Sequence, residues 1–87
     1  MTIIVISGYG KVGRCVLDAA LNDADIKVGA IVEKKDHPLI GSQEKGVTVV
    51  DDVGSLGEVN VIIEFSTPQA VSEHILWARE NGVAMLV

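Results

Sequence analysis

A glycine-rich turn between a β-branched run and an apolar helical repeat limits what this chain can fold into. The run Ile3–Ile6 is apolar on both faces, as in a strand buried inside a parallel sheet. The turn that follows carries glycines at positions 8, 10 and 13, in the pattern G-x-G-x-x-G. Val12, Val16 and Ala20 then recur every fourth residue, which predicts an amphipathic helix over about 11–22. A strand, a tight turn and a helix in this order begin a right-handed β-α-β unit.

The rest of the chain repeats this alternation of strand and helix. Apolar runs predict further strands over 27–32, 47–50, 61–65 and 83–87, and residues 34–46 form a polar loop. A second helix is expected from Pro68 to about Asn81, with Ser66 and Gln69 spaced as a capping box. The fold class is therefore α/β, a Rossmann-type doubly wound parallel sheet truncated after about five strands, in the order 3-2-1-4-5.

Composition excludes several classes of protein. The 87 residues are 48% hydrophobic and 22% charged, which is typical of a globular domain and not of a disordered tail. A net charge of −5 and three aromatic residues provide neither the field nor the stacking surface that nucleic acid binding needs. No run is long enough to span a membrane, and the first residues do not resemble a secretory signal. The single cysteine excludes an internal disulfide, so we expect a cytoplasmic protein.

The position of the glycine turn indicates a dinucleotide site. One glycine permits the turn, the next lets the backbone approach a pyrophosphate, and the last lets helix and strand pack closely. The amino end of the helix adds free N–H groups for the anion. Glu33 lies 20 residues beyond Gly13, at the end of the second predicted strand, where such folds place a carboxylate on the adenosine ribose. A tight turn without a ligand remains the alternative.

With these motifs in place, the chain resembles the N-terminal part of the 4-hydroxy-tetrahydrodipicolinate reductase (dihydrodipicolinate reductase) family of lysine biosynthesis, by the diaminopimelate route. Four segments carry the resemblance in order: the glycine loop closing on Gly13–Arg14, Glu33–Lys34, the loop Pro38–Ser42, and Ile63–Pro68. The glycine loop is one residue shorter than the usual form, and Lys11–Val12 replaces an Arg-Met pair.

The resemblance implies an oxidoreductase that uses NADH or NADPH on a small heterocyclic substrate. It implies cofactor-binding roles for Gly8, Tyr9, Gly10, Lys11, Val12, Gly13, Glu33, Lys34, Phe65, Ser66, Thr67 and Pro68. The family's His-His-x-x-Lys segment, which serves the substrate, has no match here, so no catalytic residue is assigned. We expect residues 1–87 to be the dinucleotide-binding domain of a longer two-domain enzyme, inactive alone, whose family forms homotetramers.

Two other functions fit the same motifs. The chain also suits the cofactor domain of a glucose–fructose oxidoreductase or aspartate dehydrogenase type enzyme, because Thr67–Pro68 precedes His74 by a similar spacing. It also suits a stand-alone dinucleotide-sensing module that performs no chemistry.

The remaining polar candidates are expected to have structural roles. We interpret His74 as a surface or satisfied core histidine, His37 as a solvated loop residue, and Cys15 as a small buried apolar residue. No Cys or Asp stands at ligand spacing around either histidine, so no metal site is predicted.

Overall fold

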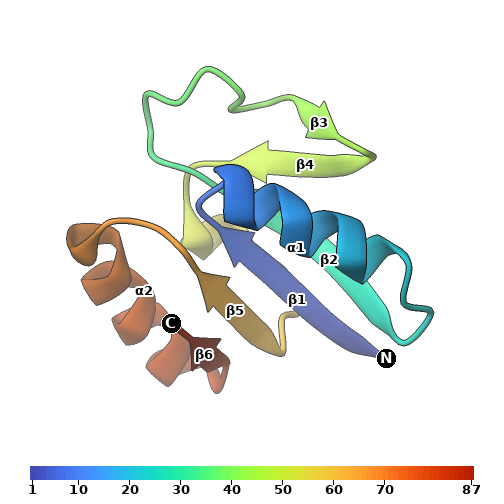
Figure 1. Cartoon of the computed structure of the whole chain (residues 1–87). Helices are drawn as coiled ribbons and strands as arrows, with labels where there is room; N and C mark the ends of the chain where they lie inside the picture. The colour runs from blue at the N-terminus through green and yellow to red at the C-terminus, as the bar shows by residue number, and fades with distance from the viewer.

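The computed structural model describes residues 1–87, and a single six-stranded sheet organises them (Figure 1). The strands are β1 (Thr2–Ser7), β2 (Ile26–Val32), β3 (Gln43–Glu44), β4 (Val47–Val50), β5 (Val61–Glu64) and β6 (Ala84–Leu86). The helices are α1 (Lys11–Leu21), the short 3₁₀ helix η1 (Val53–Ser55) and α2 (Pro68–Asn81). Neither α-helix is long and apolar enough to cross a membrane.

The sheet order β3-β4-β2-β1-β5-β6 confirms the predicted topology. All five predicted strands are present, and each pairs in parallel with its neighbour, from β4 through β2, β1 and β5 to β6. The strand order reverses at β1. After β1 the chain adds β2 and β4 on one side of it, and it then crosses over to add β5 and β6 on the other side. Such a reversal places a crevice at the carboxyl ends of the central strands.

Alternating side chains of β1 build one core on each face of the sheet. Ile4 and Ile6 point to the face covered by α1, where they join Leu17 in a buried cluster. Val5 points to the opposite face and joins Ile62, with Trp77 of α2 packed over them. The two-sided burial explains why β1 is a continuous β-branched run instead of an alternating one.

The sequence-based prediction missed strand β3, which lies within the predicted polar loop 34–46. Gln43 and Glu44 pair antiparallel with β4 across a two-residue turn, Lys45–Gly46. Both turn residues have positive φ, 53° and 85°. A two-residue hairpin turn with positive φ at both positions is usually recognised in a sequence by Asn-Gly. Here lysine stands in the first position, so the sequence did not predict the hairpin.

Two predictions about the helices are wrong. The capping box of Ser66 and Gln69 does not form; Thr67 caps α2 instead, and its hydroxyl accepts from the Ala70 amide at 3.4 Å. Cys15 is exposed instead of buried, because it lies on the side of α1 opposite Gly13 and Leu17, which face the sheet.

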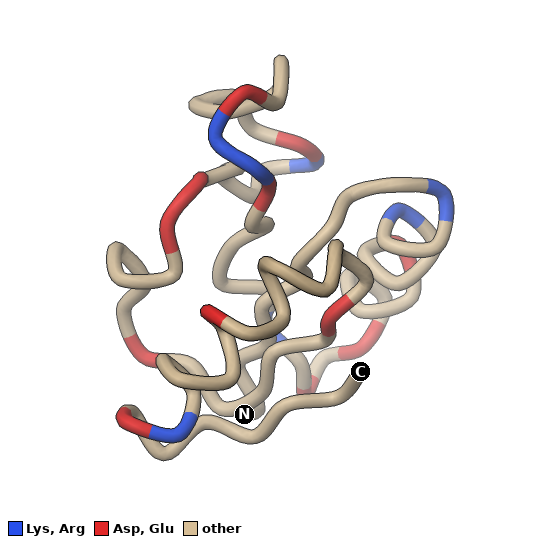
Figure 2. The backbone as a smooth tube through the Cα atoms, turned by 90° about the vertical axis from the view of Figure 1, so that its left-hand side faces the viewer, with Lys and Arg blue, Asp and Glu red and all other residues tan.

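Basic and acidic residues are interleaved over the surface. Figure 2 shows Lys and Arg spread over several loops and elements with Asp and Glu among them, so that no basic face forms. Lys45 binds Asp18, and Arg14 lies 3.9 Å from Glu44. These two pairs join the β3–β4 turn to α1.

Candidate functional site: a cleft at the switch point of the sheet

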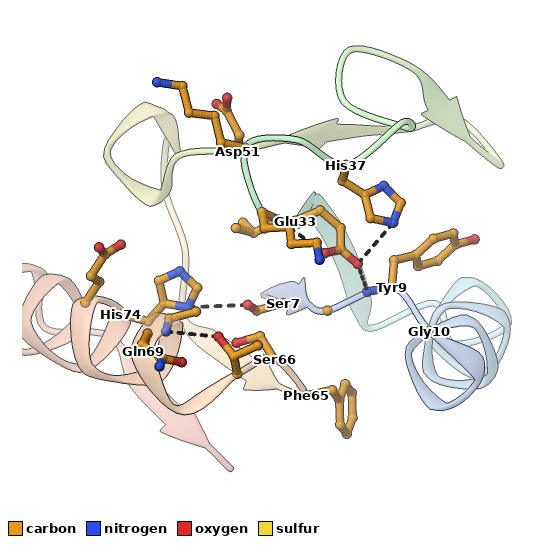
Figure 3. Close-up of a pocket in the computed structure, with 17 residues that line it drawn as sticks. Ser7, Tyr9, Gly10, Glu33, His37, Asp51, Phe65, Ser66, Gln69 and His74 are labelled. Atoms are coloured by element: carbon orange, nitrogen blue, oxygen red, sulfur yellow. Dashed lines mark hydrogen bonds and ion pairs between the residues drawn. The ribbon is translucent and has the colours of Figure 1, made fainter.

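A cleft of about 790 Å³ opens at the carboxyl ends of β1, β2 and β5 (Figure 3). It lies at the reversal of strand order, where ligands bind in open α/β sheets. The residues that line it are Ser7, Gly8, Tyr9, Gly10, Val32, Glu33, Lys34, Lys35, His37, Asp51, Phe65, Ser66, Thr67, Gln69, Ala70, Glu73 and His74.

The three glycines of the turn have distinct surroundings. Gly8 has φ +94°, and a side chain there would meet the Phe65 carbonyl carbon at 2.9 Å. A Cβ on Gly13 would lie 2.3 Å from the Gly8 carbonyl oxygen, so α1 and the end of β1 touch there. A Cβ on Gly10 would meet nothing within 4 Å, because this glycine borders the open cleft. Gly8 therefore permits the tight turn, Gly13 permits the close contact between helix and strand, and Gly10 leaves the backbone open to a ligand.

The amino end of α1 adds amide donors to this edge of the cleft. Gly10 is the N-cap residue and no side chain caps the helix. The first intrahelical bond runs from the Arg14 amide to the Gly10 carbonyl at 3.0 Å. The amides before it have no acceptor inside the helix, and they carry its partial positive charge.

Glu33 brings a carboxylate beside the glycine turn. It follows β2 directly, and its own amide donates to the Val50 carbonyl at 2.8 Å, which fixes its backbone. Its Oε2 accepts from the Tyr9 amide at 2.6 Å, and its Oε1 accepts from the Lys34 amide at 3.2 Å. Glu33 and the glycine turn, 24 residues apart in sequence, thus form one wall of the cleft.

Tyr9 contributes to this wall through its backbone. Its ring is buried in the core under α1, with the Arg14 guanidinium 4.5 Å from the ring centroid. Only the amide reaches the Glu33 carboxylate, so a different side chain here would leave that hydrogen bond in place.

The opposite wall comes from the segment between β5 and α2. The Phe65 amide donates to the Ser7 carbonyl at 2.7 Å, which holds this segment against β1. Phe65 itself is 41% exposed and lines the cleft together with Ser66 and Thr67.

A buried polar cluster beside this wall contains Ser66 and three residues that were not predicted as part of the site, Ser7, Glu64 and His74. Glu64 and His74 are 4% and 6% exposed and hydrogen bond through Oε1 and Nδ1. Ser66 donates its hydroxyl to the other carboxylate oxygen of Glu64, and the Ser7 hydroxyl lies 3.3 Å from His74 Nδ1. The cluster joins β1, β5 and α2 directly behind the cleft. An acid inside an otherwise apolar strand, followed ten residues later by histidine, was the available signal.

Burial alone would raise the pKa of Glu64, but hydrogen bonds from His74, Ser66 and Ser7 outweigh it and hold the pKa below its ordinary value of 4.5. A lowered folded-state pKa means that the unfolded chain binds more protons in this range. The stabilisation is therefore complete above pH 4.5 and is lost as the pH falls below 4.5 toward the folded-state value.

We accordingly expect the free energy of unfolding to fall when the pH is lowered from 6 to 3. Urea denaturation across this range measures it, and Glu64→Gln is the matched variant because it cannot ionise. The variant should be less stable than the parent at pH 6, by about 3 kcal/mol for a broken buried pair, and should lose less stability on acidification. Parallel pH profiles for the two proteins would show that Glu64 is not the titrating group.

The structure brings most of the predicted site residues together. Eight of the twelve line the cleft: Gly8, Tyr9, Gly10, Glu33, Lys34, Phe65, Ser66 and Thr67. The other four lie outside its lining: Lys11, Val12, Gly13 and Pro68. Val12 is 57% exposed on α1, and Gly13 is buried against Gly8, so these two act on the site only through the helix.

Both histidines of the chain border the cleft. His74, expected to be a surface or satisfied core histidine, is buried with its Nδ1 hydrogen bonded. His37 is not a solvated loop residue; its ring is 21% exposed and lies 3.6 Å from the Glu33 carboxylate. No group of three or more His, Cys, Asp and Glu side chains is close enough together to hold a metal ion.

Comparison with known proteins agrees with this geometry. The chain matches the family described as "Dihydrodipicolinate reductase, N-terminus" over residues 1–87. Relatives named 4-hydroxy-tetrahydrodipicolinate reductase include proteins of Acinetobacter baumannii, 35% identical over 95% of this chain, and Ralstonia pickettii, 28% identical over all of it. A Chromobacterium violaceum protein of the same name is 26% identical over 98% of the chain. These alignments cover 33%, 36% and 35% of the relatives, so the chain spans about a third of their length.

A family of reductases with a dinucleotide-type fold implies a nicotinamide cofactor. The match also favours this family over the glucose–fructose oxidoreductase and aspartate dehydrogenase types that the Thr67–Pro68 spacing left open. Because the match spans every residue from 1 to 87, this chain belongs to the dihydrodipicolinate reductase family, as its N-terminal part.

Proposed function

We propose that residues 1–87 form the dinucleotide-binding domain of an NAD(P)H-dependent reductase acting on 4-hydroxy-tetrahydrodipicolinate, in the diaminopimelate route to lysine. The observation that carries the proposal is the position of Gly10, which borders the cleft with open space at its Cβ and lies in the same wall as the Glu33 carboxylate. The substrate is taken from the relatives, which are named 4-hydroxy-tetrahydrodipicolinate reductase.

The residues of the cleft fit a dinucleotide from end to end. The Gly8–Gly13 turn and the uncapped α1 amides would hold the pyrophosphate, and Glu33 would accept the adenosine ribose hydroxyls. Phe65, Ser66 and Thr67, with Pro68 fixing the start of α2, would border the nicotinamide ribose. When bound, the nicotinamide supplies the hydride for the reduction.

In this proposal the chain's own residues orient the cofactor, and none of them is assigned as the proton donor to the substrate. Glu64 and His74 support the Phe65–Thr67 wall, because Glu64 accepts from the Ser66 hydroxyl and hydrogen bonds to Nδ1 of His74 in α2. Transfer chemistry also needs groups around the acceptor. We assign these groups to a part of the enzyme other than residues 1–87.

The proposed function is tested with the whole enzyme that contains residues 1–87, because these residues alone are expected to be inactive. The enzyme should oxidise NADH or NADPH only when 4-hydroxy-tetrahydrodipicolinate is present, measured by the loss of absorbance of the reduced nicotinamide. Oxidation that is independent of that substrate, or that occurs only with another acceptor, would contradict the proposal.

Both NADH and NADPH should bind, with dissociation constants within about tenfold, or ~1.4 kcal/mol. Glu33 suits the two hydroxyls of NADH but repels a 2′-phosphate, whereas Lys34 and Lys35 follow it in the cleft lining and attract one. A lysine makes a point-charge contact, so attraction offsets the repulsion without exceeding it. Titration calorimetry at low and high salt measures this, and salt should weaken NADPH more than NADH.

Lys34→Ala should weaken NADPH selectively, while Glu33→Ala should weaken NADH. Lys27→Ala is the matched control, because Lys27 is an exposed lysine near the opposite end of β2. Equal losses for both cofactors in Lys34→Ala would show that Lys34 does not contact the 2′-phosphate.

A further inference from the structure

His37 is placed against the acid that the proposed function assigns to the adenosine ribose. Its Nε2 lies 3.6 Å from Glu33 Oε2, the same oxygen that accepts from the Tyr9 amide at 2.6 Å. Figure 3 shows the imidazole and the Tyr9 amide both directed at this carboxylate. The Glu33 and His37 side chains are 14% and 21% exposed, so water reaches this contact only in part.

The backbone determines which nitrogen of His37 carries hydrogen. The Leu39 amide donates to His37 Nδ1 at 3.1 Å, so Nδ1 must be an acceptor without a proton. In the neutral ring the hydrogen is then on Nε2. The N–H of the imidazole therefore faces Glu33 Oε2.

The loop that carries His37 is held from several sides. The His37 amide donates to the Lys34 carbonyl at 2.9 Å, and the Ser42 hydroxyl donates to the Leu39 carbonyl at 2.6 Å. Leu39 and Ile40 pack against the core under α1. These contacts hold the loop and its imidazole in place, so that the imidazole can restrict the position of the Glu33 side chain.

We propose that His37 is a positioning residue that holds the Glu33 carboxylate ready for a diol, and that it thereby favours NADH over NADPH at this site. The inference rests on the proposed dinucleotide function and adds a determinant of its cofactor choice. Charged neighbours of this pair are Lys34 and Lys35, which line the cleft, and Asp36.

The contact between His37 and Glu33 affects the two cofactors differently, because NADH presents two ribose hydroxyls to the Glu33 carboxylate and NADPH presents a 2′-phosphate. A carboxylate already fixed in place loses little freedom on accepting two ribose hydroxyls, so NADH gains affinity. A 2′-phosphate requires the carboxylate to turn away, which breaks its contact with His37. Removing that contact therefore lowers the affinity for NADH, whereas NADPH is spared the cost of breaking it.

Two amide substitutions separate the two nitrogens of the ring. In His37→Asn the side-chain oxygen can replace Nδ1 and keep the Leu39 hydrogen bond, but nothing reaches Glu33. In His37→Gln the longer side chain can bring an N–H to the position of Nε2. Calorimetric titration of the parent and both variants with NADH and NADPH gives the affinity ratios, and urea denaturation checks that each variant is folded.

We expect His37→Asn to weaken NADH about fivefold, or ~1 kcal/mol, and to tighten NADPH slightly, by less than about twofold. His37→Gln should remain within about twofold of the parent for both cofactors. In a Glu33→Ala background the difference between Asn and Gln at position 37 should vanish, because the residue acts through Glu33.

Three results would overturn the inference. If Asn preserves the affinity ratio and Gln does not, His37 acts only through the Leu39 turn. If both variants weaken both cofactors equally, its role is general support of the loop. If the Asn–Gln difference persists without Glu33, the effect does not pass through this carboxylate. Failure of the parent to bind either cofactor is a separate result, which would refute the proposed function and the inference with it.

Discussion

Gly13→Ala should destabilise the domain by about 3 kcal/mol, the upper part of the range for overpacking. The new Cβ would lie 2.3 Å from the Gly8 carbonyl oxygen, which is backbone and cannot rotate away. Relief requires α1 to move from β1, and this would open the contact between Leu17 and the strand. A domain of this size has a total stability of about 4–13 kcal/mol, so the loss is a large fraction of it.

Urea denaturation measures this change, and Gly10→Ala is the matched control. It introduces the same methyl group three residues earlier, where nothing lies within 4 Å. Its stability should fall by about 1 kcal/mol, because alanine is a poorer N-cap residue than glycine. Equal stability of Gly13→Ala and the parent would mean that helix and strand are not in contact there.

Gly10→Ala should instead abolish most cofactor binding, by about a hundredfold or ~2.7 kcal/mol. The open space at its Cβ is the space that the pyrophosphate would take in the proposed function. Calorimetry with NADH and NADPH should show a similar loss for both, because the two cofactors share the pyrophosphate. Unchanged affinity in a folded Gly10→Ala protein would show that the pyrophosphate does not bind against Gly10.

The same substitution at two glycines thus separates folding from binding. Gly13→Ala acts on the packing of α1, and Gly10→Ala acts on the cleft. A protein in which both substitutions affected only stability would have a tight β-α turn without a ligand.

The sheet could be predicted because its determinants are local. Strand runs such as Ile3–Ile6 are buried on both faces and read as continuous apolar segments, and short right-handed crossovers leave few strand orders. The position of Glu33 beside the glycine turn followed from the same rules, since parallel strands end at one edge of the sheet. In the structure its carboxylate accepts a hydrogen bond from the Tyr9 amide of that turn.

What could not be predicted depends on tertiary contacts that no local pattern encodes. Ser66 has the spacing of a helix cap, but its hydroxyl is drawn to the buried Glu64 carboxylate, and Thr67 caps α2 instead. His37 lies next to Pro38 in the predicted polar loop, which suggested a solvated residue. The Leu39 amide and the Glu33 carboxylate hold it in the wall of the cleft.

An amide chemical-shift titration of the ¹⁵N-labelled 87-residue chain with NADH shows directly whether this cleft binds a dinucleotide. We expect the largest shifts at Gly10, Lys11, Gly13 and Glu33, followed by Ser66 and Thr67 across the cleft. A second hollow of about 300 Å³, lined by Lys27, Gly29 and Leu56 among others, provides an internal control. Shifts gathered around that hollow, or no saturable shifts at all, would contradict the claim that this cleft binds a dinucleotide.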